Sequence, residues 1–495
     1  MRLQNPLRLE RGLGHTEASY YLPSRESGVN DMYLHLGFSA DPRTTQRNRV
    51  ALVWALLRLK HPLLASAVEM HDYNDIRFVF NPYPSPEGAL VDANKNLDYR
   101  TGTKDELLDS YLNGPRTLSA DRLSRLIVSQ NQCSPEPNAT GHWADYDLLI
   151  CTTHFVGDGM ALHQFAHDFF TLLSMEKTDD ELNAMMKEEW HVRYGDQFSE
   201  MTLPASLEDR LPATSGGRLH ELASRIDFLQ SQDKLIGGQF FPKRSGRPRK
   251  TVVPTIAFDS ERTRKMLKLC KAHSVSISSA LFALCNVAWA RTRNETPHLP
   301  MLMYSALNLR SYLTPDELND SYWFLAISYF NIVLPAFLPS SGDVAKTFWL
   351  RAKSARDQSA RAAKHKLIIS RSREMAKERG DRARCWAKED DDKARGLVSP
   401  PPVKVNNSNP PATALIGLSL LGNLDGIYKH ATYPKVKLHT LTTGSRQRSG
   451  AMLLFGYTFV GKLWVSLGYD ENGFEDDVVH RFWQNLLGSM EELLL

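Results

Sequence analysis

TTHFVGDGMALHQF, residues 152–165, begins within a largely apolar run at 146–153 that predicts a buried strand. His154 stands at the end of that strand, Asp158 follows four residues later, and Gly159 begins a helix predicted over 159–173. A histidine at a strand end can face a cleft, and with an ordinary pKa of about 6.5 it can accept a proton at neutral pH. Asp158 can hold the turn by hydrogen bonds or an ion pair, and Gly159, without a Cβ, permits close backbone approach. From these residues alone, the alternative is a capped helix start with a surface histidine.

The rest of the chain predicts further strands and helices in both halves. Apolar or alternating runs predict strands at 33–38, 76–80, 124–130, 251–258, 302–309, 326–334, 415–421, 451–459 and 463–469. Helical spacing predicts helices at 44–59 and 474–494, and a short polar side chain at 259 or 260 can cap another helix.

The order of these elements predicts a two-lobed α/β protein with mixed sheets. We expect an N-terminal lobe at 1–231 that carries the HxxxDG motif, a crossover linker at 232–250 and a C-terminal lobe at 251–495. Within the last of these, 344–395 is charged and helix-prone, and the proline-rich stretch 398–413 is predicted to be a mobile loop.

Composition and charge exclude several classes of protein. The 495 residues include 60 Lys and Arg against 56 Asp and Glu, and a net charge of +4 does not indicate a nucleic-acid surface. No apolar run approaches the ~18 residues of a membrane span, and the start MRLQNPLRLERGLGH has no apolar signal core, so neither a bilayer span nor secretion is expected. Five scattered cysteines without a CxxC pair argue against a zinc ribbon or a disulfide framework. A globular cytoplasmic protein is therefore expected.

Four further features each have a structural and a functional interpretation. PKRSGRPRK at 242–250 can bind phosphate, but a solvated linker is favoured. His163 and His167 have a metal-binding spacing, but no third ligand is evident, so packing or exposure is favoured. Cys151 can be proposed as a nucleophile, yet strand alternation places it opposite the motif histidine, which favours a core cysteine. GYTFVGKL at 456–463 imitates a phosphate-binding loop but lacks the Ser or Thr that holds magnesium.

Several segments together resemble the CoA-dependent acyltransferase superfamily. This superfamily includes peptide-synthetase condensation domains, plant BAHD acyltransferases, alcohol acetyltransferases and fungal trichothecene O-acetyltransferases, and the likeness is greatest to the trichothecene 15-O-acetyltransferase group. Besides HxxxDG, the likeness rests on LLRLKHPLLASAV (56–68), SALNLRSYL (305–313), SLLGNLDGIY (419–428) and GKLWVSLGYDENGFEDDVVHRFWQNLLGSMEEL (461–493). Because these segments occur in the expected order, together they are more specific than any single motif.

Two departures from the family narrow the assignment. The plant-type DFGWG motif is absent, which weakens a BAHD assignment. Thr153 stands where condensation domains have the first of two histidines, and no LGGxS carrier motif follows. A carrier-dependent peptide synthetase is therefore less favoured, although a partner chain could supply the carrier.

The resemblance implies two lobes of the chloramphenicol-acetyltransferase type with a tunnel between them. His154 would be the general base that takes a proton from a substrate hydroxyl as its oxygen attacks an acyl-CoA thioester. Asp158 would pair with Arg310 and, together with Gly159, would support the site rather than react. The implied reaction is O-acylation, above all acetylation, of a secondary-metabolite alcohol such as a trichothecene-like sesquiterpenoid.

The resemblance also implies what the protein binds. Acetyl-CoA or another acyl-CoA would be the cosubstrate, no metal would be required, and no acyl-enzyme is expected because no activated Ser or Cys is evident beside the histidine. The protein is expected to be a monomer without nucleic-acid or membrane partners, and the residues of the CoA site are not assigned. Two alternatives stay open: a condensation-type enzyme that uses carrier-bound thioesters, and a catalytically silent binding protein of the same fold.

Overall fold

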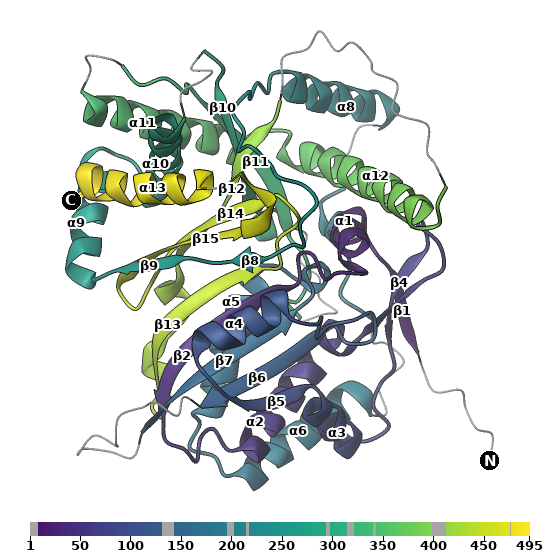
Figure 1. Ribbon diagram of the computed structural model, residues 1–495. Coiled ribbons are helices and arrows are strands. Elements are labelled where there is room, and N and C mark those ends of the chain that lie inside the picture. The colour runs from purple at the N-terminus through teal and green to yellow at the C-terminus, as the bar shows by residue number, and fades with distance from the viewer. Residues whose placement is uncertain are drawn as a thin grey trace.

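The computed structural model describes residues 8–130, 143–195, 202–213, 217–293, 298–313, 321–339, 343–397, 412–475 and 477–495. The predicted mobile loop at 398–413 lies, apart from its last two residues, outside the described residues. In the described ranges the strands form three sheets, of which the two larger ones are the cores of two lobes (Figure 1).

A five-stranded sheet of order β13-β2-β7-β6-β5 forms the lower lobe in Figure 1. Its strands are β2 (Met32–Ala40), β5 (Leu97–Thr101), β6 (Ser124–Gln130), β7 (Ala144–Thr152) and β13 (Val436–Ser445). β7 pairs with β2 on one side and with β6 on the other, and its residues from Leu148 onward are buried. This central place explains why the sequence before the HxxxDG motif is so largely apolar.

Helices cover both faces of the five-stranded sheet. They are α2 (Arg47–Lys60), α3 (Pro86–Lys95), α4 (Lys104–Asn113), α5 (Gly159–Leu173) and α6 (Asp179–Tyr194). Leu149 and Cys151 face the cluster that α4 contributes to, whereas Leu148 and Ile150 face the cluster of α2 and α5. The alternation of β7 therefore places Cys151 in a closed hydrophobic core.

A seven-stranded sheet of order β11-β10-β12-β14-β15-β8, with β9 also paired to β15, forms the upper lobe. Its strands are β8 (Thr251–Val252), β9 (Thr255–Phe258), β10 (Met301–Asn308), β11 (Ile327–Leu334), β12 (Ala414–Asn423), β14 (Met452–Phe459) and β15 (Lys462–Asp470). β12 runs parallel to both β10 and β14, whereas β14 and β15 are antiparallel, so the sheet is mixed. One face packs against α9 (Ser260–Ala272), α10 (Ile277–Thr292), α11 (Val344–Ala363) and α13 (Val478–Leu494).

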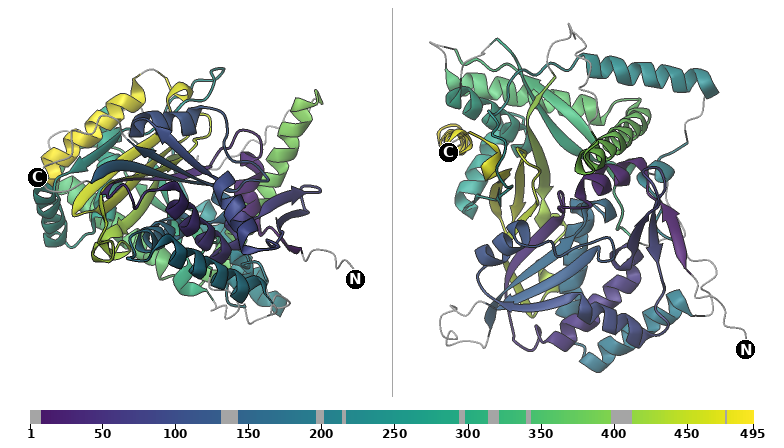
Figure 2. Two further views of the ribbon diagram at one scale, coloured as in Figure 1. Left: turned by 90° about the horizontal axis from the view of Figure 1, so that it is seen from below. Right: turned by 45° about the vertical axis from the view of Figure 1, so that its right-hand side comes forward.

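Two helices that are far apart in the sequence lie side by side between the lobes. They are α1 (His15–Ser24) and α12 (Ile368–Ala394), which are in contact, and the right-hand view of Figure 2 shows the purple and the light green helix beside each other. The remaining elements are β1 (Leu9–Gly12), β3 (Ala67–Met70) and β4 (Ile76–Phe80), which form a small sheet, α7 (Leu207–Arg210), α8 (Gly217–Asp233), and the 3-10 turns η1 (Pro62–Ala65), η2 (His154–Val156), η4 (Arg310–Tyr312), η5 (Leu424–Gly426), η6 (His430–Thr432) and η7 (Glu471–Gly473).

β13 comes from the second half of the chain but pairs with β2 of the first half. The pairing runs from Val436 opposite Ala40 to Ser445 opposite Met32. The lobe boundaries at 231 and 251 stay a prediction, and β13 adds a strand of the second half to the sheet of the first. In the predicted linker most of the basic segment is exposed, but Phe241 is buried against the upper lobe.

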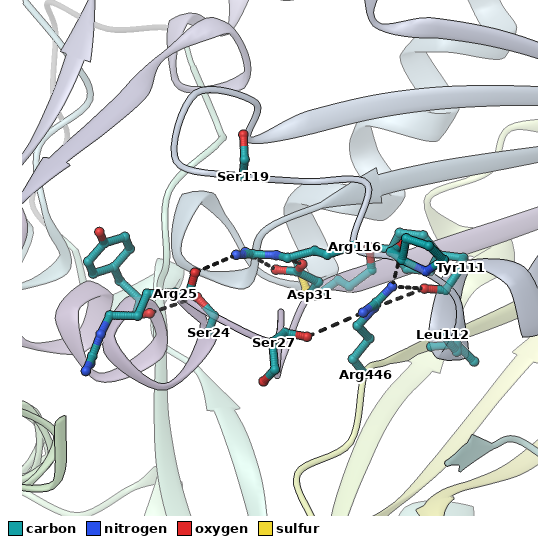
Figure 3. A network of polar contacts seen from close by, with 12 residues as sticks. Ser24, Arg25, Ser27, Asp31, Tyr111, Leu112, Arg116, Ser119 and Arg446 are labelled. Atoms are coloured by element: carbon teal, nitrogen blue, oxygen red, sulfur yellow. Dashed lines mark hydrogen bonds and ion pairs between the residues drawn. The ribbon is translucent and has the colours of Figure 1, made fainter. Parts of the chain in front are cut away.

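A buried polar network fixes the junction at the end of β13 (Figure 3). Arg116 donates to both carboxylate oxygens of Asp31, and its Nε lies 2.7 Å from Oδ2. Arg446, directly after β13, donates to the backbone carbonyl of Tyr111 through Nε and Nη2. Burial raises the pKa of Asp31, although Arg116 acts in the opposite direction. The network holds in place the loop before β2 and the loop after β13. Residues of both loops line the cavity that is described below.

Candidate active site

His154 stands in the 3-10 turn η2, directly after the central strand β7. Its ring stacks on Tyr20 of α1, with centroids 4.1 Å apart and an angle of 24° between the planes. Its Nδ1 lies 3.2 Å from the carbonyl oxygen of Gly157. Because a carbonyl oxygen can only accept, Nδ1 carries the proton of the neutral ring and Nε2 carries the lone pair. Nε2 is therefore the ring nitrogen that can accept a proton.

The surroundings of His154 favour the neutral imidazole. Burial lowers the pKa of His154 from its ordinary 6.5, because a desolvated ring is harder to charge. The carboxylate of Asp158 and the carbonyl of Gly157 act in the opposite direction, and the guanidinium of Arg379 adds to the lowering. A base form that is populated at neutral pH suits proton transfer from a substrate.

Asp158 is buried, and its contacts lead away from the cavity. Its Oδ1 accepts from the backbone N–H groups of Met160 and Ala161 and so caps α5. Nη1 of Arg310 lies 2.9 Å from Oδ1 and 2.8 Å from Oδ2, and the N–H of Ala326 donates to Oδ2 at 2.9 Å. The structure thus brings Asp158 and Arg310 together, and the pair joins the turn of His154 to η4 and the start of β11.

The tightest backbone approach in the motif occurs at Gly157. A Cβ on this residue would lie 2.5 Å from Cε3 of Trp323, which is fully buried. At Gly159, where the sequence predicts close approach, a Cβ would lie 3.3 Å from the flexible end of Leu421. Both glycines admit neighbouring side chains, but Gly157 is the one whose missing side chain sets the position of η2.

His154 lines a cavity of about 370 Å³ at the place where the ends of β7 and β13 meet the upper sheet, α1 and α12. Its walls come from α1, α12, the strands β10, β11, β12 and β14, and the segments that flank the network of Figure 3. The volume lies within the range of about 300–1,000 Å³ that is typical of small-molecule sites. The cavity occupies the position between the lobes at which the resemblance implies a tunnel.

Sequence reasoning missed three residues that shape this site, Tyr20, Gly157 and Arg379. Tyr20 and Arg379 are distant from His154 in the chain, and the packing of α1 against α12 brings both to the cavity. No spacing in the sequence signals that packing. For Gly157 the sequence did contain a signal, because the motif has this second glycine besides Gly159.

The other candidate residues have structural contacts. Nδ1 of His163 lies 2.9 Å from the hydroxyl of Tyr428, and Nδ1 of His167 lies 2.5 Å from that of Tyr433. Burial raises the pKa of the Cys151 thiol, so its thiolate is disfavoured. The segment that imitates a phosphate-binding loop is the β14–β15 hairpin.

The described residues show neither a cluster of metal ligands nor a single membrane-spanning helix. No group of three or more His, Cys, Asp or Glu side chains is placed there to hold a metal ion. No single described helix is long and apolar enough to cross a bilayer. Only α9 and α10 taken together reach that length and apolar composition among the described helices, and they are bent by 93° relative to each other.

Sequence comparison finds one partial relative. No protein-family profile matches the chain. O-acetyltransferase pigM of Monascus ruber is 23% identical over 295 residues, which are 58% of this chain and 53% of that protein. The match thus spans about half the length of this curated relative.

Structural comparison covers nearly the whole chain. The trichothecene 15-O-acetyltransferase of Fusarium sporotrichioides has a TM-score of 0.74 at 11% identity and covers 99% of this chain and 96% of its own. The first condensation domain of the CDA synthetase has a TM-score of 0.60 at 12% identity, with coverages of 99% and 97%. The epimerization domain from the third module of tyrocidine synthetase B has a TM-score of 0.59 at 14% identity, with coverages of 100% and 99%. These matches confirm the predicted fold: the chain has the mixed α/β fold that the trichothecene 15-O-acetyltransferase shares with condensation domains.

Proposed function

We propose that the chain is an acyl-CoA-dependent O-acyltransferase that transfers an acyl group, above all acetyl, to a hydroxyl of a secondary metabolite such as a trichothecene-like sesquiterpenoid. The observation that carries the proposal is the place of His154, whose neutral ring keeps Nε2 as a base on the wall of a cavity between the lobes. The fold of an acetyltransferase and the partial sequence match to pigM support the same class of reaction.

The proposed chemistry needs one base and no covalent enzyme intermediate. Nε2 of His154 takes the proton of the acceptor hydroxyl while the hydroxyl oxygen forms a bond to the thioester carbonyl carbon. The C–S bond then breaks, and the proton on Nε2 passes to the departing CoA thiolate. General-base assistance contributes typically ~10²–10⁴-fold, and holding the two reactants together contributes up to ~7–11 kcal/mol.

Asp158 and Arg310 have a structural role in this proposal. Their ion pair and the N-cap of α5 hold η2 at the end of β7, so the imidazole keeps its orientation. Neither residue is among those that line the cavity.

A thioester screen tests the proposal. Purified protein is incubated with acyl-CoAs of increasing chain length and a panel of terpenoid and polyketide alcohols, and products are detected by mass spectrometry. The expected result is an acceptor heavier by one acyl group, with release of one equivalent of CoA thiol. A parallel series offers the same acyl groups on a phosphopantetheinyl carrier protein.

The two series separate the proposal from its alternatives. Transfer from the carrier protein but not from acyl-CoA would identify a condensation-type enzyme. Binding of alcohols without transfer from either donor would identify a silent binding protein. We also propose that the protein is a monomer and that it is located in the cytoplasm. Light scattering in solution tests the monomeric state.

A further inference from the structure

Arg379 places a positive charge in the wall of the cavity, and no anion in the described part of the chain pairs with it. It belongs to α12, and its Cζ lies 4.3 Å from the ring centroid of Tyr329 and 5.8 Å from that of Tyr20. Its Nε is buried without a hydrogen-bond partner. Asp390, the acid among the lining residues, is exposed, and no hydrogen bond joins it to Arg379 within the described ranges. The neighbouring Glu378 accepts from another arginine of the helix.

Among the described residues, no side chain or backbone group accepts a hydrogen bond from the buried Nε–H of this guanidinium. A guanidinium has five N–H donors and stays charged at physiological pH. The faces of Tyr20 and Tyr329 attract the cation, but they do not replace an oxygen acceptor for its N–H groups. A buried donor without a partner costs free energy, so a native site that keeps one calls for an explanation.

The surroundings of Arg379 connect it to the candidate base. The hydroxyls of Tyr20 and Tyr329 are hydrogen bonded to each other, and Tyr304 packs edge to face on Tyr329 with centroids 6.2 Å apart. Tyr20 also stacks on His154. The guanidinium is therefore separated from the imidazole by one aromatic ring, and all five side chains line the same cavity.

We propose that Arg379 binds a carboxylate of the acceptor, so that the preferred acceptors are hydroxylated organic acids. The hydroxyl would face His154 while the carboxylate, at the other end of an apolar body, accepts hydrogen bonds from Arg379. The tyrosine rings would pack on that body, because aromatic side chains bury apolar surface well. This inference rests on the proposed function and narrows its acceptor to secondary metabolites that carry a carboxylate as well as the hydroxyl.

Two other anions fit the geometry less well. The phosphates of CoA are separated from the thioester by the whole pantetheine arm, whereas Arg379 is one ring away from the base. The oxyanion of a tetrahedral intermediate would form beside His154, whereas the ring of Tyr20 lies between Arg379 and that imidazole. A second charged group on the acceptor suits the observed separation better than either.

Calorimetric titration with a matched pair of probes tests the inference without any acyl donor. The probes are 6-hydroxy-2-naphthoate and its methyl ester, which share the ring and the hydroxyl and differ in charge. We expect the wild type to bind the acid at least about tenfold more tightly than the ester, as a charge-assisted hydrogen bond would give. Arg379→Gln should remove this preference, whereas Lys377→Gln, which removes an exposed charge from the same helix, should keep it.

A second variant covers the case in which Arg379→Gln does not fold. Arg379→Lys keeps the charge but loses the planar fork, so it should weaken binding of the acid and leave the ester unchanged. Equal binding of acid and ester to the wild type, including no binding of either at millimolar concentration, would overturn the inference. So would an acid preference that survives in a folded Arg379 variant. A titration with CoA that weakens in the Arg379 variants while naphthoate binding persists would assign the charge to the donor instead.

Failure of the acceptor assignment and failure of the proposed activity give different results. An acid preference that depends on Arg379, in a protein that transfers no acyl group, would defeat the proposed function and leave the binding site standing. Acyl transfer to neutral alcohols, unchanged in Arg379→Gln and without any acid preference, would defeat the acceptor assignment alone.

Discussion

At the scale of single residues, the chemistry of the site depends on two opposing effects on one imidazole. Burial disfavours the charged ring of His154, and the nearby carboxylate of Asp158 favours it. The first effect is the larger, so the pKa is lowered. The hydrogen bond from Nδ1 to Gly157 fixes the tautomer, and the stack on Tyr20 fixes the plane of the ring.

The lowered pKa of His154 predicts the pH dependence of the reaction. A general base must be deprotonated, so activity should rise with pH through the pKa of His154 and then level off. Because that pKa lies below 6.5, the midpoint of the acid limb of kcat/KM is expected below pH 6.5. In Arg379→Gln the midpoint should move to higher pH, because a nearby cation that lowers the pKa is gone. A wild-type midpoint above 7 would contradict this prediction, and rates measured from pH 4.5 to 8.5 provide the test.

Asp158→Ala is predicted to act mainly on stability and on the order of the site. The substitution removes the N-cap of α5 and leaves Arg310 without its carboxylate partner. Breaking a buried pair costs typically ~3–5 kcal/mol, and we expect about 3 kcal/mol because Arg310 is 23% exposed. Urea unfolding measures the loss, and Asp381→Asn, which breaks an exposed pair with Arg384, should cost less than about 1 kcal/mol. An Asp158→Ala protein with normal stability and intact structure but no activity would make Asp158 a direct catalyst.

At the scale of elements, η2 is positioned by packing as well as by its hydrogen bonds. The turn has little room because Trp323 lies against Gly157. Gly157→Ala would force the two apart, and overpacking of this kind costs typically ~1–3 kcal/mol. A shift of the imidazole by about 1 Å can reduce the rate ~10²-fold. We therefore expect a marked fall in kcat with a smaller effect on folding.

Gly159→Ala is the matched control for Gly157→Ala. Its added methyl would meet the movable end of Leu421, so the rate should stay within about threefold of the wild type. Steady-state kinetics and thermal unfolding of both variants test the comparison. Equal rates in the two alanine variants would show that the contact with Trp323 does not position the base.

Local sequence patterns predict an element where the residues that determine it are close to one another in the chain. The helix predicted at 159–173 has the bounds of α5, because Asp158 caps one end and an apolar face continues through it. The strand predicted at 251–258 is divided into β8 and β9 around Pro254, which has no N–H for a ladder. Residues 436–439 alternate in burial and 441–444 are all buried, but the pairing of this strand with β2 depends on contacts with the other half of the chain.

At the scale of the whole molecule, the cavity depends on how the two halves are joined. The motif predicts that His154 matters, and the packing of α1, α12 and the upper sheet decides what surrounds it. Tyr20 and Arg379 have no sequence relation to the motif, so local patterns could not predict them. The fold itself was predictable because several family-like segments occur in order along the chain.

Arg446 is predicted to stabilise the junction between the halves. Its guanidinium donates to the backbone carbonyls of Tyr111, Gly114 and Pro115, and methionine cannot replace these bonds. Arg446→Met should therefore cost about 3 kcal/mol of unfolding free energy. Arg448→Met, two residues further on and exposed, should change stability by no more than about 0.5 kcal/mol. Similar unfolding midpoints for the two variants would mean that the network in Figure 3 does not stabilise the junction between the two halves of the chain.

The most direct test of the central claim is single-turnover acyl transfer by His154→Ala beside the wild type, with unfolding temperatures measured on the same preparations. If Nε2 is the base, the variant keeps its unfolding temperature and loses about 10²–10⁴-fold of the rate. A folded His154→Ala protein that transfers the acyl group at the wild-type rate would contradict the assignment.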